Sequence, residues 1–182
     1  MVPGALSTVT EDFVTGPHRV DSVHPELTDG LAQLWGRAAV AGGAAGFGPN
    51  DPVESLHAAA AELVTEVTAK RTHLLTIGRS HVLVGATALR PHPLPLRAHT
   101  GELALLLVDP DLRDQGWEQQ LHDAALAQAQ ARGLARVEAF DREGSVLARL
   151  CAANGWTERG RWPGALREGS QDLDGAWFTR DV

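Results

Sequence analysis

The spacing of apolar residues along the chain predicts four helices. In residues 26–41 and 52–70, apolar side chains recur three and four positions apart, which is typical of amphipathic helices. A third helix is predicted after Trp117, with Gly133 as its C-terminal cap. A short fourth helix is predicted over residues 145–154. All four patterns are amphipathic, so each helix should bury one face against a sheet.

Apolar runs of strand length predict seven strands between and after these helices. They cover residues 18–23, 72–77, 82–89, 102–108, 135–140, 156–162 and 174–180. The resulting order is β-α-α-β-β-β-α-β-α-β-β, which predicts an α/β fold with a central mixed sheet and helices on both faces. Residues 17–182 form one domain in this interpretation, and residues 1–16 are a loose N-terminal arm.

The strand predicted at residues 102–108 leads through a proline and a glycine-bearing loop into the third helix. The start of a helix exposes unpaired backbone N–H groups and the positive end of the helix dipole, so it favours anions such as phosphate. An ordinary strand-to-helix turn would give the same local pattern. On this element alone the two interpretations are equally supported.

Composition and charge exclude several classes of function. A formal net charge of −7 argues against a nucleic-acid partner, which would require a basic face. The single cysteine, Cys151, excludes an internal disulfide and a cysteine-based zinc site, and we expect no metal. No apolar run reaches membrane length, and the N-terminus lacks the pattern of a signal peptide, so we expect a cytoplasmic protein.

Several segments together resemble the GNAT superfamily of N-acetyltransferases. Its phosphate signature, Arg/Gln-x-x-Gly-x-Gly/Ala after a strand ending Val-x-Pro, is matched by Val-Asp-Pro at 108–110 and Arg-x-x-Gly-x-Glu at 113–118. Residues 149–156, Arg-Leu-Cys-Ala-Ala-Asn-Gly-Trp, resemble the family segment Arg-Leu-Tyr-x-x-x-Gly-Phe/Trp. The tail, with segments 162–164 and 174–178, resembles the closing strands of bacterial members. The resemblance covers about residues 18–182 and implies the same fold.

The resemblance implies acetyl-CoA as co-substrate and direct transfer of the acetyl group to a primary amine of a small molecule. It places the pyrophosphate on Arg113, Asp114, Gln115, Gly116, Trp117 and Glu118. It places the pantetheine arm along the backbone of Leu106, Leu107 and Val108. Family members are often dimers, so a homodimer is an open expectation, and no nucleic acid or membrane partner is implied.

Two residues depart from the family pattern. Glu118 stands where the family has Gly or Ala, and it adds bulk and negative charge beside the anion site. It could block CoA, or turn outward as an ordinary first-turn acid. Cys151 stands where the family has a tyrosine general acid, and the chain contains no tyrosine. Cys151 is therefore either a substitute acid or a small buried apolar residue, and the second interpretation is favoured.

The resemblance also implies a proton acceptor for the amine. Glu102 matches the family's strand carboxylate, although it could equally be a charged residue at the exposed start of the strand. His99, in the preceding loop, is a supplementary candidate. We expect the acceptor pocket to be walled by residues 42–49, which we interpret as a lid, and by residues 90–100 and 156–167. Trp35 or Trp162 could add an aromatic wall, although each is also a candidate for the core.

Two functions remain open at this point. The first is an acyl-CoA-dependent N-acetyltransferase, favoured by Glu102, Arg113 and Gly116. The second is a relative whose transfer chemistry is lost or changed, favoured by Glu118 and Cys151. Such a relative could bind a ligand, act in regulation, or use an acyl-carrier-protein donor in biosynthesis.

Overall fold

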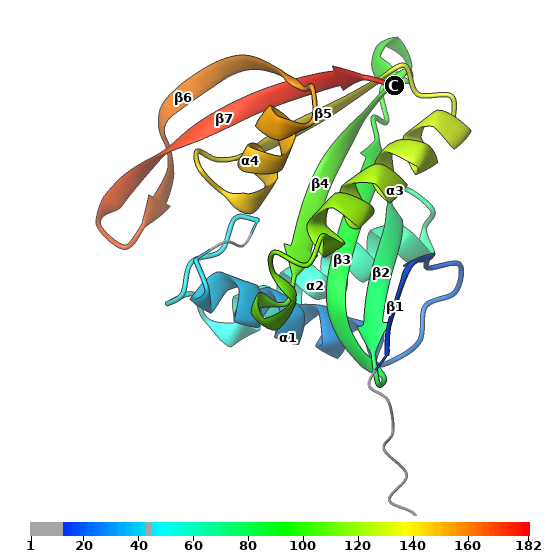
Figure 1. Ribbon diagram of the computed structural model, residues 1–182, viewed down its shortest axis with the longest axis vertical. Coiled ribbons are helices and arrows are strands. Elements are labelled where there is room, and N and C mark those ends of the chain that lie inside the picture. The colour runs from blue at the N-terminus through cyan, green and yellow to red at the C-terminus, as the bar shows by residue number, and fades with distance from the viewer. Residues whose placement is uncertain (1–12, 43–44) are drawn as a thin grey trace, which may run out of the picture.

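The computed structural model describes residues 13–42 and 45–182 (Figure 1). Within them, seven strands form one sheet in the order β1-β2-β3-β4-β5-β7-β6. The strands are β1 Val14–Arg19, β2 His73–Arg79, β3 Val82–Pro91, β4 Thr100–Val108, β5 Arg136–Arg142, β6 Thr157–Glu168 and β7 Gln171–Asp181. Neighbouring strands are antiparallel except β4 and β5, which are parallel. The predicted mixed sheet is therefore confirmed.

Two pairs of helices cover the sheet, one pair on each face (Figure 1). The helices are α1 Leu27–Val40, α2 Val53–Thr68, α3 Trp117–Ala131 and α4 Val146–Ala153. The apolar faces of α1 and α2 share one buried cluster with Leu74, Leu105 and Leu107. Those of α3 and α4 share a second cluster with Leu103 and Val137 from the other face. Burial on both faces explains why the central strands are almost continuously apolar.

All four predicted helices are confirmed, but two strand predictions differ from the structure. The first strand covers Val14–Arg19 instead of residues 18–23, because its partner β2 begins at His73 and offers nothing to pair beyond that point. The predicted glycine-rich connection after Trp162 is also wrong, since most of it continues as strand in a long β6–β7 hairpin. A bulge containing Gly164, at φ +62°, accommodates the irregular residues there. The predicted arm lies mostly in residues 1–12, outside the described residues.

The feature that positions the site is the separation of β4 from β5 (Figure 1). The two strands pair only from Thr100 opposite Arg136 to Glu102 opposite Glu138. Beyond these residues they diverge, so the β5-facing backbone edge of β4 is left without a strand partner. Ala104 is the extra residue of a β-bulge in β4, which bends the strand where the divergence starts.

No helix among the described residues is long and apolar enough to cross a membrane. The same residues contain no cluster of three or more histidine, cysteine or acidic side chains arranged to hold a metal ion.

Candidate functional site

Asp109 fixes the place where β4 ends and the glycine-bearing loop begins. Its backbone N–H donates to the carbonyl of Val84 at 2.8 Å, and its buried carboxylate accepts from Arg37 of α1 at 2.7 Å. The same carboxylate accepts the N–H of Asp111 at 3.1 Å. The loop therefore leaves the sheet from a point that is tied to strand β3 and to helix α1.

The loop at residues 113–118 forms a cradle of free backbone amides. Asp114 and Gly116 adopt positive φ angles of 60° and 84°, and Gly116 is the N-cap residue of α3. Among the described residues, the N–H groups of residues 114–118 have no hydrogen-bond acceptor. A Cβ atom on Gly116 would meet nothing within 4 Å, so the space above the loop is open. Converging amides at a helix start form an anion site without any lysine.

The side chains of this loop leave the cradle accessible. Glu118 is partly exposed and forms no hydrogen bond or ion pair with the described residues, so its carboxylate does not satisfy the loop amides. Arg113 reaches back to α1 and donates to the carbonyl of Ala41 at 2.9 Å. Gln115 donates to the carbonyl of Asp111 at 3.0 Å. These contacts hold the loop shape through side chains and leave the amides free.

A cavity of about 260 Å³ lies at the open end of the divergence, near the ends of α1 and β5. Its lining includes residues of the 45–49 segment, the β6–β7 hairpin at 165–168, and Asp141, Arg142 and Ser145. Arg142 donates to the carbonyl of Gly42, and its guanidinium lies 3.7 Å from the Glu168 carboxylate. Residues from two of the three segments that we predicted to wall the acceptor pocket, 42–49 and 156–167, line this cavity, whereas no residue of the 90–100 loop does.

Comparison with known proteins identifies the family to which this domain belongs. Residues 44–150 match the family model described as the acetyltransferase (GNAT) family. The chain belongs to the GNAT acetyltransferase family. No curated protein sequence matches the chain.

Solved structures share the GNAT fold at low sequence identity. Ribosomal-protein-alanine N-acetyltransferase from Brucella melitensis superimposes with a TM-score of 0.72 at 17% identity, covering 91% of this chain and 99% of that one. An N-acetyltransferase from Staphylococcus aureus Mu50 gives 0.72 at 16% identity, covering 92% and 99%. The protein yncA from Salmonella typhimurium, solved with its cofactor acetyl-CoA, gives 0.70 at 15% identity, covering 92% and 93%.

Asp141 is a residue of the candidate site that the sequence interpretation did not single out. It lies near the end of β5 and lines the cavity. Burial raises the pKa of the Asp141 carboxyl above its ordinary value, although the Arg142 N–H at 2.7 Å and the Ser145 hydroxyl oppose that shift. The only sequence signal was a carboxylate directly after an apolar strand. Such a signal indicates a candidate site residue only when the divergence of β4 and β5 is known, because that divergence makes room for a cavity at the end of β5.

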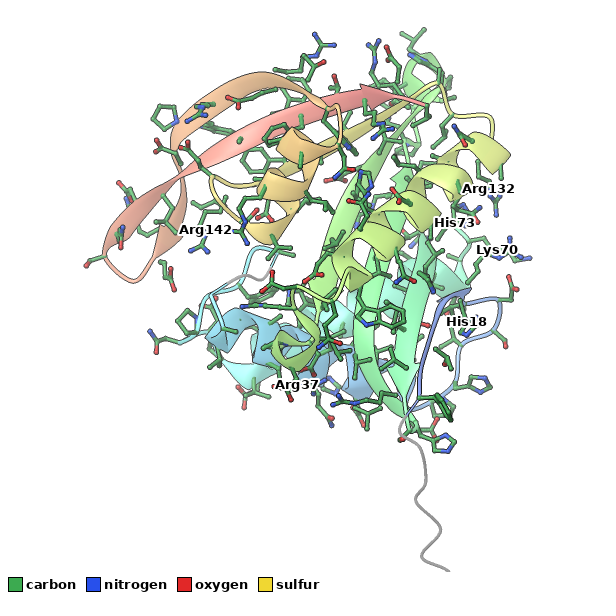
Figure 2. All side chains as sticks on the ribbon, viewed as in Figure 1. His18, Arg37, Lys70, His73, Arg132 and Arg142 are labelled. Carbon is green, nitrogen blue, oxygen red and sulfur yellow. The ribbon has the colours of Figure 1, made fainter. Side chains whose placement is uncertain are left out.

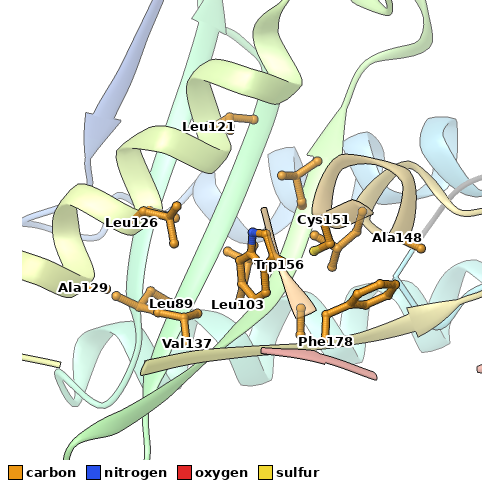
Figure 3. Packing of buried hydrophobic residues seen from close by; sticks show 14 of the residues in the cluster. Leu89, Leu103, Leu121, Leu126, Ala129, Val137, Ala148, Cys151, Trp156 and Phe178 are labelled. Atoms are coloured by element: carbon orange, nitrogen blue, oxygen red, sulfur yellow. The ribbon is translucent and has the colours of Figure 1, made fainter. Parts of the chain in front are cut away.

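Cys151 lies on the buried face of α4, inside the cluster that also contains Ala148, Trp156 and Phe178 (Figure 3). Its side chain is fully buried. Burial, and then the nearby Asp141 carboxylate, raise the pKa of the Cys151 thiol to about 12. The thiol therefore stays protonated at neutral pH, and its surroundings are those of a core residue.

Glu102 and His99 lie at the closed end of the divergence. The Glu102 side chain is 48% exposed, and its carboxylate accepts from Arg90 at 3.1 Å, while Arg90 also pairs with Glu66 of α2 at 2.9 Å. His99 is exposed, and its carbonyl accepts the N–H of Ala135 at 2.8 Å. Neither side chain lines the cavity beside Asp141.

The two tryptophans proposed as an aromatic wall have different environments. Trp35 is buried in α1, and its ring meets Phe47 edge-on with centroids 5.3 Å apart. This contact anchors the segment that we interpret as a lid, although residues 43 and 44 lie outside the described residues. Trp162 is exposed on β6 beside Phe140, with centroids 6.4 Å apart. Neither ring lines the cavity itself.

Proposed function

We propose that this GNAT domain moves an acetyl group from acetyl-CoA to a primary amine of a small molecule by direct transfer. The observation that carries the proposal is the arrangement along one divergence of strands. Free amides lie where β4 leads into α3, and a cavity lined by the partly buried carboxylate of Asp141 lies at the end of β5. A donor and an amine held on these two sides would meet without a covalent enzyme intermediate.

The residues present fit acetyl-CoA. The amides of Asp114, Gly116 and their neighbours would bind the pyrophosphate, and the open space over Gly116 allows close approach. The unpaired backbone edge at Leu106, Leu107 and Val108 would bind the pantetheine arm and polarise the thioester carbonyl. When bound, the donor supplies an activated acetyl group; this chain holds and orients it.

The amine must lose a proton before it attacks, and two carboxylates could accept it. The resemblance implies Glu102, whereas the geometry favours Asp141, because Asp141 lines the cavity and has a raised pKa. A carboxylate with a raised pKa holds a proton more firmly and is therefore a better base near neutral pH. We propose that Asp141 accepts the proton from the amine. Glu102 and His99 are the alternative acceptors, which mutation can test.

The departing thiolate also needs a proton. A thiol of ordinary pKa, about 8.5, is a better leaving group than an alkoxide, so a strong general acid is not essential. Cys151 holds a proton at neutral pH but is fully buried on the core-facing side of α4. We therefore propose that solvent protonates the thiolate. Under this proposal the missing tyrosine lowers the rate but does not abolish transfer.

Two measurements test the proposal. Isothermal titration with acetyl-CoA and with CoA should give saturable binding of both. Release of free thiol should then follow addition of small primary amines, and mass spectrometry should show the amine heavier by one acetyl group. Absence of binding at millimolar acetyl-CoA would contradict the proposal outright.

A relative with changed chemistry is the second candidate, and two features favour it: Glu118 at the cradle and the lack of any tyrosine. Such a protein would bind CoA without turnover, or would accept the acyl group only from an acyl carrier protein. Binding without thiol release across the amine panel, followed by release from an acyl carrier protein, would favour this candidate.

A further inference from the structure

A second polar cavity, of about 230 Å³, lies at the opposite end of α3 from the amide cradle. Its lining comes from the end of β1, the α2–β2 connection, the start of β2 and the C-terminal end of α3. With a rise of about 1.5 Å per residue, the 15 residues of α3 separate the two sites by about 22 Å. At about 30 Å³ per water, the cavity could hold several waters or one small hydrated ion.

The charges on this cavity are mostly positive, although the whole chain carries −7. Arg19, Lys70 and Arg132 line it, and Asp21 is the only carboxylate among the lining residues. Asp21 pairs with Arg19 at 2.6 Å. Among the described residues, no carboxylate pairs with Lys70 or Arg132. Two cations at the cavity therefore lack a counterion within residues 13–42 and 45–182.

His73 lines the same cavity as these two cations, and the three residues are labelled near one another in Figure 2. It is 8% exposed, and its Nδ1 accepts a hydrogen bond from the Arg132 guanidinium at 3.3 Å. An Nδ1 that accepts carries no proton, so the neutral ring has its hydrogen on Nε2. Burial, and then the charges of Arg132 and Arg19, lower the pKa of His73. The cavity thus holds a histidine whose neutral form is favoured first by burial and then by the charges of Arg132 and Arg19.

Cations also occur at the C-terminal ends of helices, where they offset the helix dipole, and Lys70 and Arg132 follow α2 and α3. That role alone requires neither a cavity nor a buried histidine in the same lining. We propose that Lys70, Arg132 and His73 form a binding site for a small oxyanion that carries phosphate or carboxylate groups. The site is separate from the acetyl-CoA cradle and does not depend on the proposed transfer activity.

The first experiment is a titration of the intact protein with inorganic phosphate at constant ionic strength, with chloride as the balancing salt. The His73 ring signal is followed by NMR and assigned by its absence from His73→Gln. We expect a saturable shift, and a higher pKa for His73 with phosphate bound, because the anion offsets the charges of Arg132 and Arg19 that lower this pKa. The carboxylate of Asp21 repels any bound anion. Asp21 is unchanged in every titration, so this repulsion does not alter the comparison. A parallel titration with citrate shows whether carboxylate replaces phosphate.

Matched variants locate the response. Lys70→Gln and Arg132→Gln should each weaken phosphate binding about tenfold, as expected for loss of one charge-assisted hydrogen bond. Lys70→Gln leaves the Arg132–His73 contact intact, so it separates ligand binding from a local change at the histidine. Arg136→Gln is the control, because it removes an exposed arginine that already pairs with Asp181. It should leave phosphate binding unchanged.

Three results would overturn the proposal: an equal response to chloride, equal binding by the Lys70 and Arg132 variants and the parent protein, or phosphate shifts confined to residues 114–118. A failed transfer assay would not affect the outcome, since the readout is the His73 signal and not turnover.

Discussion

The two diverging strands contribute to the site in different ways. The β4 side supplies mainly backbone groups: an unpaired strand edge and the free amides of residues 114–118. The β5 side supplies side chains, namely Asp141, Ser145 and, deeper in the core, Cys151. Backbone sites tolerate changes of side chain, whereas acid–base chemistry requires a particular group at a particular atom. The cradle is made of backbone groups, so it keeps its shape with Glu118 present. The general acid is a side chain, so the absence of the family's tyrosine removes it.

The largest expected effect comes from the β5 side. Asp141→Asn should lower kcat about 100-fold, the lower end of what general-base catalysis contributes, with little change in acetyl-CoA affinity. The raised pKa of Asp141 also predicts the pH profile: the base must be deprotonated, so activity falls as pH drops through that pKa. This acidic limb should disappear in the variant.

Glu102→Gln is the matched comparison, because it also replaces one carboxylate by its amide. We expect a change of less than about fivefold, since Glu102 is half-exposed, pairs with Arg90, and lies at the closed end of the divergence. If Glu102→Gln lowers kcat more than Asp141→Asn does, the base is Glu102, as the family resemblance implies.

A smaller effect is expected on the β4 side, from Gly116→Ala. The methyl group would enter the open space where the pyrophosphate is expected, so the Kd for CoA should rise at least about tenfold. Gly116 has φ +84°, so any side chain there also costs backbone strain. Gly155→Ala controls for that cost, because Gly155 has φ +74° with equally open surroundings but lies outside the cradle. Equal CoA binding by Gly116→Ala and the parent protein would remove the cradle from the donor site.

The sequence predicted the β4 side of the site better than the β5 side, for a physical reason. A strand, a proline, a glycine and a helix start lie within one short segment, so their geometry is local and can be read from residue order. Asp141 becomes a cavity residue only because β4 and β5 separate and the β6–β7 hairpin approaches the 45–49 segment. These contacts join residues about 100 positions apart. Residue spacing alone cannot indicate them.

The same contrast applies to the fold. The helices were predicted from local periodicity, and the order of elements followed from them. The start of β1 and the length of the β6–β7 hairpin depend on which residues find a partner across the sheet. Glycine and proline suggested a loop after Trp162, but pairing with β7 outweighed that local preference there.

A weaker effect should come from Glu118→Gln, which keeps the size of the side chain and removes its charge. A carboxylate about 5 Å from a phosphate costs about 1 kcal/mol, which corresponds to roughly fivefold in affinity. CoA should therefore bind about fivefold more tightly to the variant. Glu118 has no partner among the described residues, so no stabilising contact is lost. Isothermal titration measures the change, and Asp123→Asn, one turn and a half further along α3, is a control for charge removal.

The smallest expected effect on activity comes from Cys151 on the β5 side, and it tests whether this thiol is the general acid. Cys151→Ala should change kcat by less than about twofold if solvent protonates the thiolate, since the residue is then only part of the core. Its stability should fall by about 1 kcal/mol, because the change leaves a small gap beside Ala148 and Phe178. Cys151→Ser separates the roles, since a hydroxyl keeps a proton donor at the same place but is less suited to apolar surroundings. A tenfold loss of kcat in the alanine variant that serine restores, with unchanged CoA binding, would make Cys151 the general acid despite its burial.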